Sequence, residues 1–189
     1  MTQAKIRFSS FEEYLAYDDG TEQLYELLNG ELVALPPESG RNFQIANFLF
    51  AQLLPLIGYR RLRGHGLELQ VRGEPQNRFP DFTVLQEEHI EQLQQRNTVL
   101  LWMVPPLLVV EVVSPGEASR SRDYTTKREQ YENRGVPEYW IIDPQTQIVT
   151  VLELDGTTYR EVGTFQGDQM IQSPTFSMLT LTATQIFSA

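Results

Sequence analysis

The sequence predicts an α/β domain in which helices flank a mixed central sheet and a β-hairpin is added toward each end of the chain. Three observations predict this class. A continuous apolar segment at 107–113 lies between prolines, as expected of a central strand covered on both faces. A helical pattern at 120–134 separates it from a second apolar segment at 138–142, which indicates a parallel strand pair joined by a crossover helix. Asn29-Gly30 and Asp155-Gly156 are turn sequences typical of two-residue hairpins.

Length and composition predict one domain that spans 1–189. A chain of 189 residues buries roughly 70% of its unfolded surface, which is enough for one core. The absence of cysteine excludes disulfides, thiolate zinc sites and cysteine nucleophiles. No apolar stretch approaches the ~20 residues of a membrane span, and the first ten residues hold no apolar leader segment. We therefore expect a cytoplasmic protein that does not contact a membrane.

The first third of the chain predicts a helix, a hairpin and a second helix. A capping box that starts at Ser10 predicts a helix at 10–17. The Asn-Gly turn joins predicted strands at 24–28 and 31–35. Apolar residues are dense and nearly encircling at 42–57, which predicts a well-buried helix, and no acidic residue occurs in it.

The middle of the chain predicts strands at 59–71 and 79–85, separated by a turn at 73–77. A surface helix is expected at 87–95. The buried strand at 107–113 follows it.

The last third begins with the crossover helix, which Gly135 ends, and the strand at 138–142. Strands at about 148–154 and 158–166 form the second hairpin, and a short helix is expected near Thr182. The order strand, helix, strand places the acid of the first strand and the lysine of the helix beside the central sheet.

The net charge of −10 argues against a protein that binds nucleic acid through bulk electrostatic attraction. The charge is unevenly distributed. Residues 1–40 carry eight acids and two bases, residues 41–140 carry twelve of each, and residues 141–189 carry five acids and one base. The neutral middle segment holds two basic clusters, and solvated faces and contact surfaces for a partner are both open interpretations of them. Their members are Arg60, Arg61 and Arg63, and Arg120, Arg122, Lys127, Arg128 and Arg134.

Two carboxylates stand out. Glu111 lies inside the buried strand, where an ionised carboxylate is costly unless it pairs with an arginine or binds a cation. Asp81 follows Pro80 at the start of an apolar strand. On neighbouring strands the two acids would form an all-oxygen site that suits Mg²⁺ or Mn²⁺ rather than zinc. The only histidines, His65 and His89, have no metal-ligand or triad spacing, so we expect them to be structural or exposed.

Lys127 is one of only two lysines, the other being Lys5. On the predicted helix it shares a face with Tyr124 and Tyr131, at spacings of three and four residues. A surface lysine that extends past core tyrosines is one interpretation. Beside two carboxylates and a metal, the same amine would orient or deprotonate a water, or neutralise charge that develops at a phosphate.

Several of these residues together resemble a known family. They are Pro80-Asp81, Glu111-Val112-Val113-Ser114-Pro115, Lys127, Tyr131 and Gly135-Val136-Pro137-Glu138-Tyr139-Trp140. The pattern resembles a large bacterial family of putative restriction endonucleases in the PD-(D/E)xK nuclease superfamily, and residues 25–32 resemble that family's N-terminal hairpin. The resemblance covers roughly residues 10–155. It implies a restriction endonuclease-like core at about 41–143.

The resemblance implies roles for individual residues. Asp81 matches the motif aspartate and Glu111 the second acid, and the main-chain carbonyl of Val112 would be the third metal ligand. The superfamily lysine lies two residues after the acid, where this chain has Val113. The resemblance implies that Lys127, supported by Tyr131, supplies the amine from the following helix instead.

Many members also contribute an acid from the first core helix, but this chain has no acidic residue in that helix. Glu26 and Glu68 are candidate replacements, and Glu26 is preferred because it belongs to the hairpin motif. Family members often begin the first helix with a histidine, and this chain has Asn42 there, which is neither a base nor a strong metal ligand.

The leading hypothesis is a Mg²⁺- or Mn²⁺-dependent endonuclease that hydrolyses DNA phosphodiester bonds. Two alternatives stay open: a catalytically inactive interaction module on a nuclease scaffold, and a subunit of a larger defence or mobile-element complex whose partner supplies DNA affinity. A homodimer is expected, because two sites related by a two-fold axis suit the cleavage of two strands.

Overall fold

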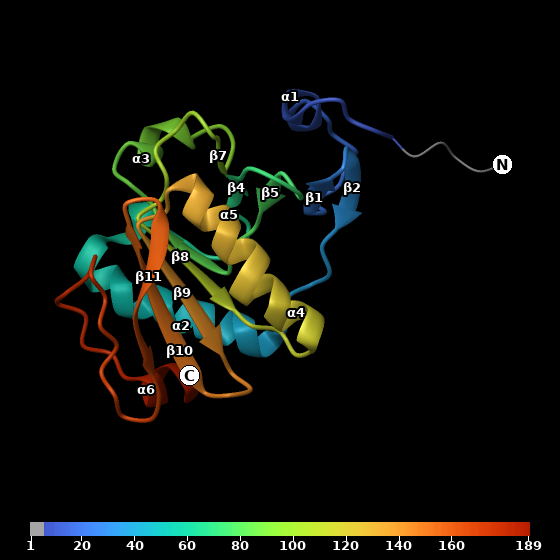
Figure 1. Ribbon diagram of the computed structural model, residues 1–189. Helices are drawn as coiled ribbons and strands as arrows, with labels where there is room; N and C mark the ends of the chain where they lie inside the picture. Colours follow the sequence, from blue (N-terminus) through green and yellow to red (C-terminus); the bar gives the residue numbers. More distant parts are fainter. Residues whose placement is uncertain (1–5) are drawn as a thin grey trace.

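A six-stranded mixed sheet forms the centre of the protein (Figure 1). The computed structural model describes residues 6–189, so Lys5 lies outside the described residues. The strand order is β11-β10-β9-β8-β6-β3, and β8 and β9 are parallel while the other neighbours are antiparallel. The strands are β3 (Leu62–Arg63), β6 (Phe82–Val84), β8 (Leu108–Val112), β9 (Glu138–Asp143), β10 (Ile148–Asp155) and β11 (Thr158–Phe165).

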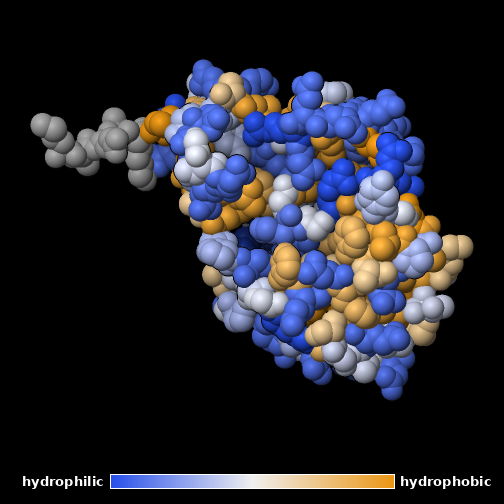
Figure 2. All heavy atoms as spheres, turned by 180° about the vertical axis from the view of Figure 1, so that it is seen from behind, coloured by the Kyte–Doolittle hydropathy of each residue, from blue (hydrophilic) through white to orange (hydrophobic). Residues whose placement is uncertain are grey.

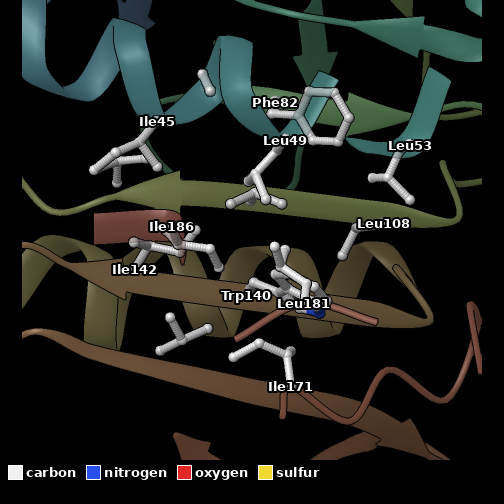
Figure 3. Close-up of a cluster of buried hydrophobic side chains, with 14 of the residues drawn as sticks. Ile45, Leu49, Leu53, Phe82, Leu108, Trp140, Ile142, Ile171, Leu181 and Ile186 are labelled. Carbon is white, nitrogen blue, oxygen red and sulfur yellow. The ribbon is translucent and has the colours of Figure 1, made fainter. Parts of the chain in front are cut away.

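Helices cover both faces of this sheet (Figure 1). Helix α2 (Gly40–Ile57) packs on one face, where Ile45, Leu49 and Leu53 meet side chains of the strands and of the C-terminal segment (Figure 3). Successive residues of β8 alternate between the two cores, so Val110 lies on the α2 side and Val109 on the other. All residues of β8 are buried, which confirms the predicted central strand.

The predicted well-buried helix at 42–57 is present as α2, but only one of its faces is buried. Phe43 is 49% exposed, and Leu54 and Leu56 are each 40% exposed. Figure 2, which views the molecule from behind, shows hydrophobic residues gathered on the surface of that side. A dense apolar pattern does not reveal which side of a helix faces solvent when polar residues are too few to mark it.

The crossover helix on the opposite face is continuous, but its middle part is π-helical rather than α-helical. It consists of α4 (Glu117–Ser121), a π-helical turn η2 (Arg122–Thr126) and α5 (Lys127–Arg134), and it ends at Gly135 with φ 81°. The sequence predicted an uninterrupted helix here. A π turn inserts an extra residue, which rotates the residues before it relative to those that follow.

The predicted strand at 59–71 divides between two sheets. Residues Tyr59–Arg61 form a 3₁₀ turn, β3 joins the central sheet, and β4 (Glu68–Gln70) joins a separate sheet with the order β5-β4-β7. Gly66, with φ 105°, lies between the two strands, so the chain changes direction there. The remaining strands of this small sheet are β5 (Asn77–Arg78) and β7 (Thr98–Val99).

The expected surface helix is shorter and less exposed than predicted. Helix α3 (His89–Gln92) has its first residue fully buried. The His89 ring accepts the Gln86 N–H at Nδ1, 3.1 Å away, and Nε2 lies 2.9 Å from the Val104 carbonyl. His89 is therefore structural, whereas His65 is exposed in a turn.

The two predicted hairpins and the terminal helices are confirmed. Strands β1 (Tyr25–Leu28) and β2 (Glu31–Ala34) meet at Asn29 and Gly30, whose φ values of 51° and 80° are those of a type I′ turn. The β10–β11 hairpin extends the central sheet. Helix α1 (Phe11–Leu15) is capped by Ser10, and α6 (Ala183–Phe187) is capped by Thr182. No helix within residues 6–189 has the length and apolar character needed to span a membrane.

Candidate active site

The fold places Asp81 beside Glu111. Phe82 of β6 pairs with Val110 of β8 in antiparallel register, so the preceding Asp81 comes opposite Glu111 and shares its face of the sheet. Asp81 Oδ2 accepts the Val112 N–H at 2.7 Å. Asp81 Oδ1 makes no hydrogen bond with any residue of the described part of the chain. Only 6% of Asp81 and 1% of Glu111 is exposed, so the two carboxylates are close together and largely removed from water.

The crossover helix places an amine and a phenol against Glu111. Lys127 Nζ donates to Glu111 Oε2 at 2.7 Å, and the Tyr131 hydroxyl donates to Glu111 Oε1 at 2.5 Å. Lys127 Nζ also lies 3.0 Å from Asp123 Oδ1, one helical turn earlier. The structure therefore brings together Asp81, Glu111, Lys127 and Tyr131, as the sequence predicted, and adds Asp123.

Burial governs the electrostatics of this cluster. It raises the pKa of Asp81 well above its ordinary value, and the neighbouring Glu111 charge raises it further. Burial also raises the pKa of Glu111, although Lys127 opposes this effect. The pKa of Lys127 would fall on burial, but the carboxylates of Glu111 and Asp123 outweigh that effect and raise it. Lys127 is therefore a protonated cation at neutral pH, which leaves it able to orient a water but not to deprotonate one.

The Val112 carbonyl, expected as a metal ligand, accepts a hydrogen bond from the first turn of α2. Asn42 Nδ2 donates to this carbonyl at 2.9 Å and also to Ser114 Oγ at 3.1 Å. A carbonyl oxygen has two lone pairs, so one acceptor position on Val112 remains. Asn42 thus ties α2 to the carboxyl end of β8.

The two candidate replacement acids lie in different surroundings. Both carboxylate oxygens of Glu26 accept from Arg78 Nη1, at 3.0 and 3.1 Å, and Arg78 Nε donates to Gln130. Glu68, in the small sheet, accepts from Tyr14 of α1 and from Asn77 and Thr98 of the neighbouring strands. Glu68 is thus held by residues outside the cluster, whereas Glu26 lies on the wall of a cavity at the end of β8.

That cavity has a volume of about 330 Å³ and lies where β8 ends. It is bounded by the connection from β2 to α2 and by the segment that follows β8. Its lining consists of Glu26, Leu35, Pro36, Pro37, Glu38, Ser39, His65, Phe79, Ser114, Pro115, Ser119 and Arg122. A larger cavity of about 630 Å³ runs along the β1–β2 hairpin and shares Leu35, Pro36, Pro37 and His65 with it. None of Asp81, Glu111 and Lys127 lines the smaller cavity. Its lining meets the cluster through Ser114, which shares the Asn42 amide with the Val112 carbonyl, and through Arg122, which contacts Asp123.

The donor set fits a hard divalent cation. Residues 6–189 contain no ready-made cluster of three histidine, cysteine or acidic side chains. Asp81, Glu111 and the Val112 carbonyl instead offer oxygens only, which is the preference of Mg²⁺ and Mn²⁺. The unbonded Asp81 Oδ1 and the raised pKa of its carboxyl indicate that a cation would relieve the local negative potential.

Sequence reasoning missed Asp123 and undervalued Asn42. Asp123 precedes Lys127 by four residues, and this helical ion-pair spacing is a signal that could have identified it. The contact between Asn42 and Val112 joins residues 70 positions apart, and no local pattern predicts it.

Comparisons with known proteins agree with this architecture. A family model, Uma2, described as a putative restriction endonuclease, matches residues 11–184. Among solved structures, a protein from Anabaena variabilis ATCC 29413, described as a putative nuclease belonging to DUF820, aligns with a TM-score of 0.69 and 20% identity. The alignment covers 95% of this chain and 97% of that chain, and it shows a shared nuclease-like α/β fold. No curated protein matches the chain. Because the family model spans most of the sequence, the chain belongs to the Uma2 putative restriction endonuclease family.

Proposed function

We propose that this protein is a metal-dependent endonuclease that hydrolyses DNA phosphodiester bonds, with Mg²⁺ or Mn²⁺ as its cofactor. One observation carries the proposal: Asp81 and Glu111 meet on adjacent strands, and Lys127 reaches Glu111 from the following helix at 2.7 Å. An amine from a helix thus lies beside the two acids, although the superfamily's usual lysine position holds Val113.

Each residue of the cluster has a distinct role in this proposal. Asp81 and Glu111 hold the cation with the Val112 carbonyl, and a bound divalent cation supplies an activated water and polarises the phosphate. Lys127 keeps a positive charge where negative charge develops on the phosphate. Tyr131 fixes the orientation of Glu111, and Asp123 is a positioning residue that holds Lys127. Glu26 stays a prediction, because Arg78 already pairs with both of its oxygens.

The test is cleavage of supercoiled plasmid by the purified full chain with Mg²⁺, with Mn²⁺ or with EDTA. We expect nicked and linear products with either metal and none with EDTA. Asp81→Asn and Lys127→Ala should each lower the rate at least about 100-fold, because each removes a group that acts on the developing charge. Circular dichroism establishes that each variant is folded. Asp168→Asn removes an exposed carboxylate and is the matched control, with an unchanged rate.

A wild-type protein that binds neither metal and cleaves no DNA would refute the proposal. The inactive interaction module or the subunit of a larger defence or mobile-element complex would then be the better interpretation. One observation favours these alternatives: Lys127 already pairs with the buried carboxylates of Glu111 and Asp123, so its charge is compensated within the protein.

A further inference from the structure

Hydroxyl groups and a guanidinium line the cavity at the end of β8. We call Ser39, Ser114, Ser119 and Arg122 the donor group of this cavity. They come from the start of α2 and from the segment between β8 and the π turn, two regions that lie next to each other in Figure 1. None of them belongs to the metal and lysine cluster proposed above.

Asn42 leaves two of these serines with hydroxyl hydrogens to donate. Ser39 Oγ accepts the Asn42 backbone N–H at 3.1 Å, and Ser114 Oγ accepts Asn42 Nδ2 at 3.1 Å. A hydroxyl has one hydrogen and two acceptor lone pairs. Neither hydroxyl donates its hydrogen to a residue in the part of the chain that the structure describes. Both hydroxyls therefore need an acceptor from a bound molecule or from solvent.

Arg122 adds an available cation. Its Nε lies 3.4 Å from Asp123 Oδ1, and its terminal nitrogens make no hydrogen bond within residues 6–189. The side chain is 45% exposed. A guanidinium with free terminal nitrogens is suited to bind two oxygens of a carboxylate or phosphate.

The acids of the cavity do not satisfy these donors. Arg78 pairs with both oxygens of Glu26. Glu38 Oε1 accepts the Ser39 backbone N–H at 2.8 Å. The cavity is lined by two acids, Glu26 and Glu38, and by Arg122, and Arg78 pairs with Glu26 from behind the lining. The formal charges of these four side chains therefore sum to zero. Recognition of an anion here depends on hydrogen bonds and on Arg122 rather than on a broad positive field.

We propose that the donor group binds the nonbridging oxygens of a phosphodiester, with Arg122 and the hydroxyls of Ser39 and Ser114 as donors. A volume of about 330 Å³ accommodates a phosphate and part of a sugar. The adjoining cavity of about 630 Å³ receives the attached nucleoside along Leu35, Pro36, Pro37 and His65. The inference rests on the proposed function, because the phosphodiester belongs to the DNA that the protein cleaves.

The test compares two probes, inorganic phosphate and a thymidine dinucleotide, titrated into the full chain and followed by NMR amide shifts. EDTA is present in one series and Ca²⁺ in the other. We expect the dinucleotide to bind more tightly than phosphate and to shift signals on both sides of the cavity. Arg122→Gln and Ser114→Ala should each weaken dinucleotide binding at least five-fold, on the order of one charge-assisted hydrogen bond. Arg60→Gln and Ser121→Ala change exposed residues outside the lining and should leave binding unchanged.

The outcomes separate this inference from the nuclease proposal. Unchanged dinucleotide affinity in both Arg122→Gln and Ser114→Ala, or no binding by wild type in either series, overturns the donor group as a phosphate site even if plasmid is cleaved. Loss of affinity in these two variants supports it even if the wild type cleaves no plasmid. In that case only the nuclease proposal fails.

Discussion

The metal-free protein compensates the ionised form of Asp81 poorly. Burial, followed by the Glu111 charge, raises its pKa in the folded state, so the folded protein holds this proton more tightly than the unfolded chain does. The stability gained from the protonated form is fully present below the unfolded pKa of roughly 3.9. It is lost as the pH rises through the raised folded pKa. As the pH rises from there toward neutrality, the cost of burying the ionised carboxylate therefore lowers the free energy of unfolding.

We predict that Asp81→Asn raises the free energy of unfolding at neutral pH by about 0.5–2 kcal/mol in EDTA, the usual range for relief of a local conflict. The amide oxygen of asparagine can still accept the Val112 N–H, so the fold is kept. Urea denaturation monitored by circular dichroism measures the difference. The gain should shrink as the pH falls through the raised folded pKa of Asp81, and Mg²⁺ should stabilise the wild type but not the variant.

The matched control is Asp168→Asn, which alters an exposed carboxylate and should change stability little. A variant less stable than wild type at neutral pH would contradict the account, because it would make the Asp81 charge a stabilising one.

Residues of the cluster differ in how well sequence predicts them. Glu111 was identifiable because an acid within an apolar strand violates the local pattern, and Asp81 became a candidate only together with it. Lys127 was identifiable from the rarity of lysine in the chain. The role of Asn42 was not identifiable, because an amide at the start of a helix is ordinary. Its partner, Val112, becomes known only from the packing of α2 against β8.

At the scale of elements, local turn chemistry predicted more than strand periodicity did. Both hairpins form where the sequence predicts them. Asn29 and Gly30 both have φ > 0, as a type I′ turn requires, whereas in the second hairpin Asp155 pairs with Thr158 and Gly156 alone provides the positive φ of a turn made by residues 156 and 157. Strands such as β3 and β5 have two residues each, which is too short to show alternation. The π turn at Arg122–Thr126 also has no recognisable pattern, although it lies between α4 and the residues that contact Glu111.

The β1–β2 hairpin gives an element-scale prediction, because it forms one wall of the two cavities. Gly30 has φ 80°, and a Cβ there would lie 2.5 Å from the Phe8 carbonyl oxygen. Gly156, in the β10–β11 turn, has φ 64° and nothing within 4 Å. Gly156→Ala should cost about 1–2 kcal/mol from the left-handed backbone alone. Gly30→Ala should cost roughly 1–3 kcal/mol more, because the backbone around Phe8 must shift.

Chemical denaturation of the two variants measures these costs, and hydrogen exchange locates them. Faster exchange in Gly30→Ala should be confined to β1, β2 and α1 while the central sheet stays protected. An equal loss of unfolding free energy in both variants would show that the close approach to Phe8 adds nothing to the cost of Gly30→Ala.

At the scale of the whole molecule, the charge distribution limits how DNA can be bound. The segments 1–40 and 141–189 carry net charges of −6 (eight acids, two bases) and −4 (five acids, one base), and the middle is neutral. Several arginines that form basic clusters in the sequence are engaged internally. Arg134 donates to the carbonyls of Leu100 and Met103, and Arg120 pairs with Asp143. These two arginines are therefore not available for phosphate contacts, and the cations that remain act against a net charge of −10. The homodimer and the domain limits 1–189 stay predictions.

We accordingly predict a shallow salt dependence for DNA binding. With Ca²⁺ replacing Mg²⁺, the logarithm of the association constant for a labelled duplex should fall with the logarithm of KCl concentration with a slope no steeper than about −3, which corresponds to roughly three phosphate contacts. Fluorescence anisotropy between about 50 and 200 mM salt measures this slope. Arg122→Gln should make it shallower by about one, and Arg60→Gln, at an exposed arginine away from the cavity, should not. A slope near −6 or steeper would show an extended basic surface, which a single acidic chain does not possess and which a partner or a second copy would have to supply.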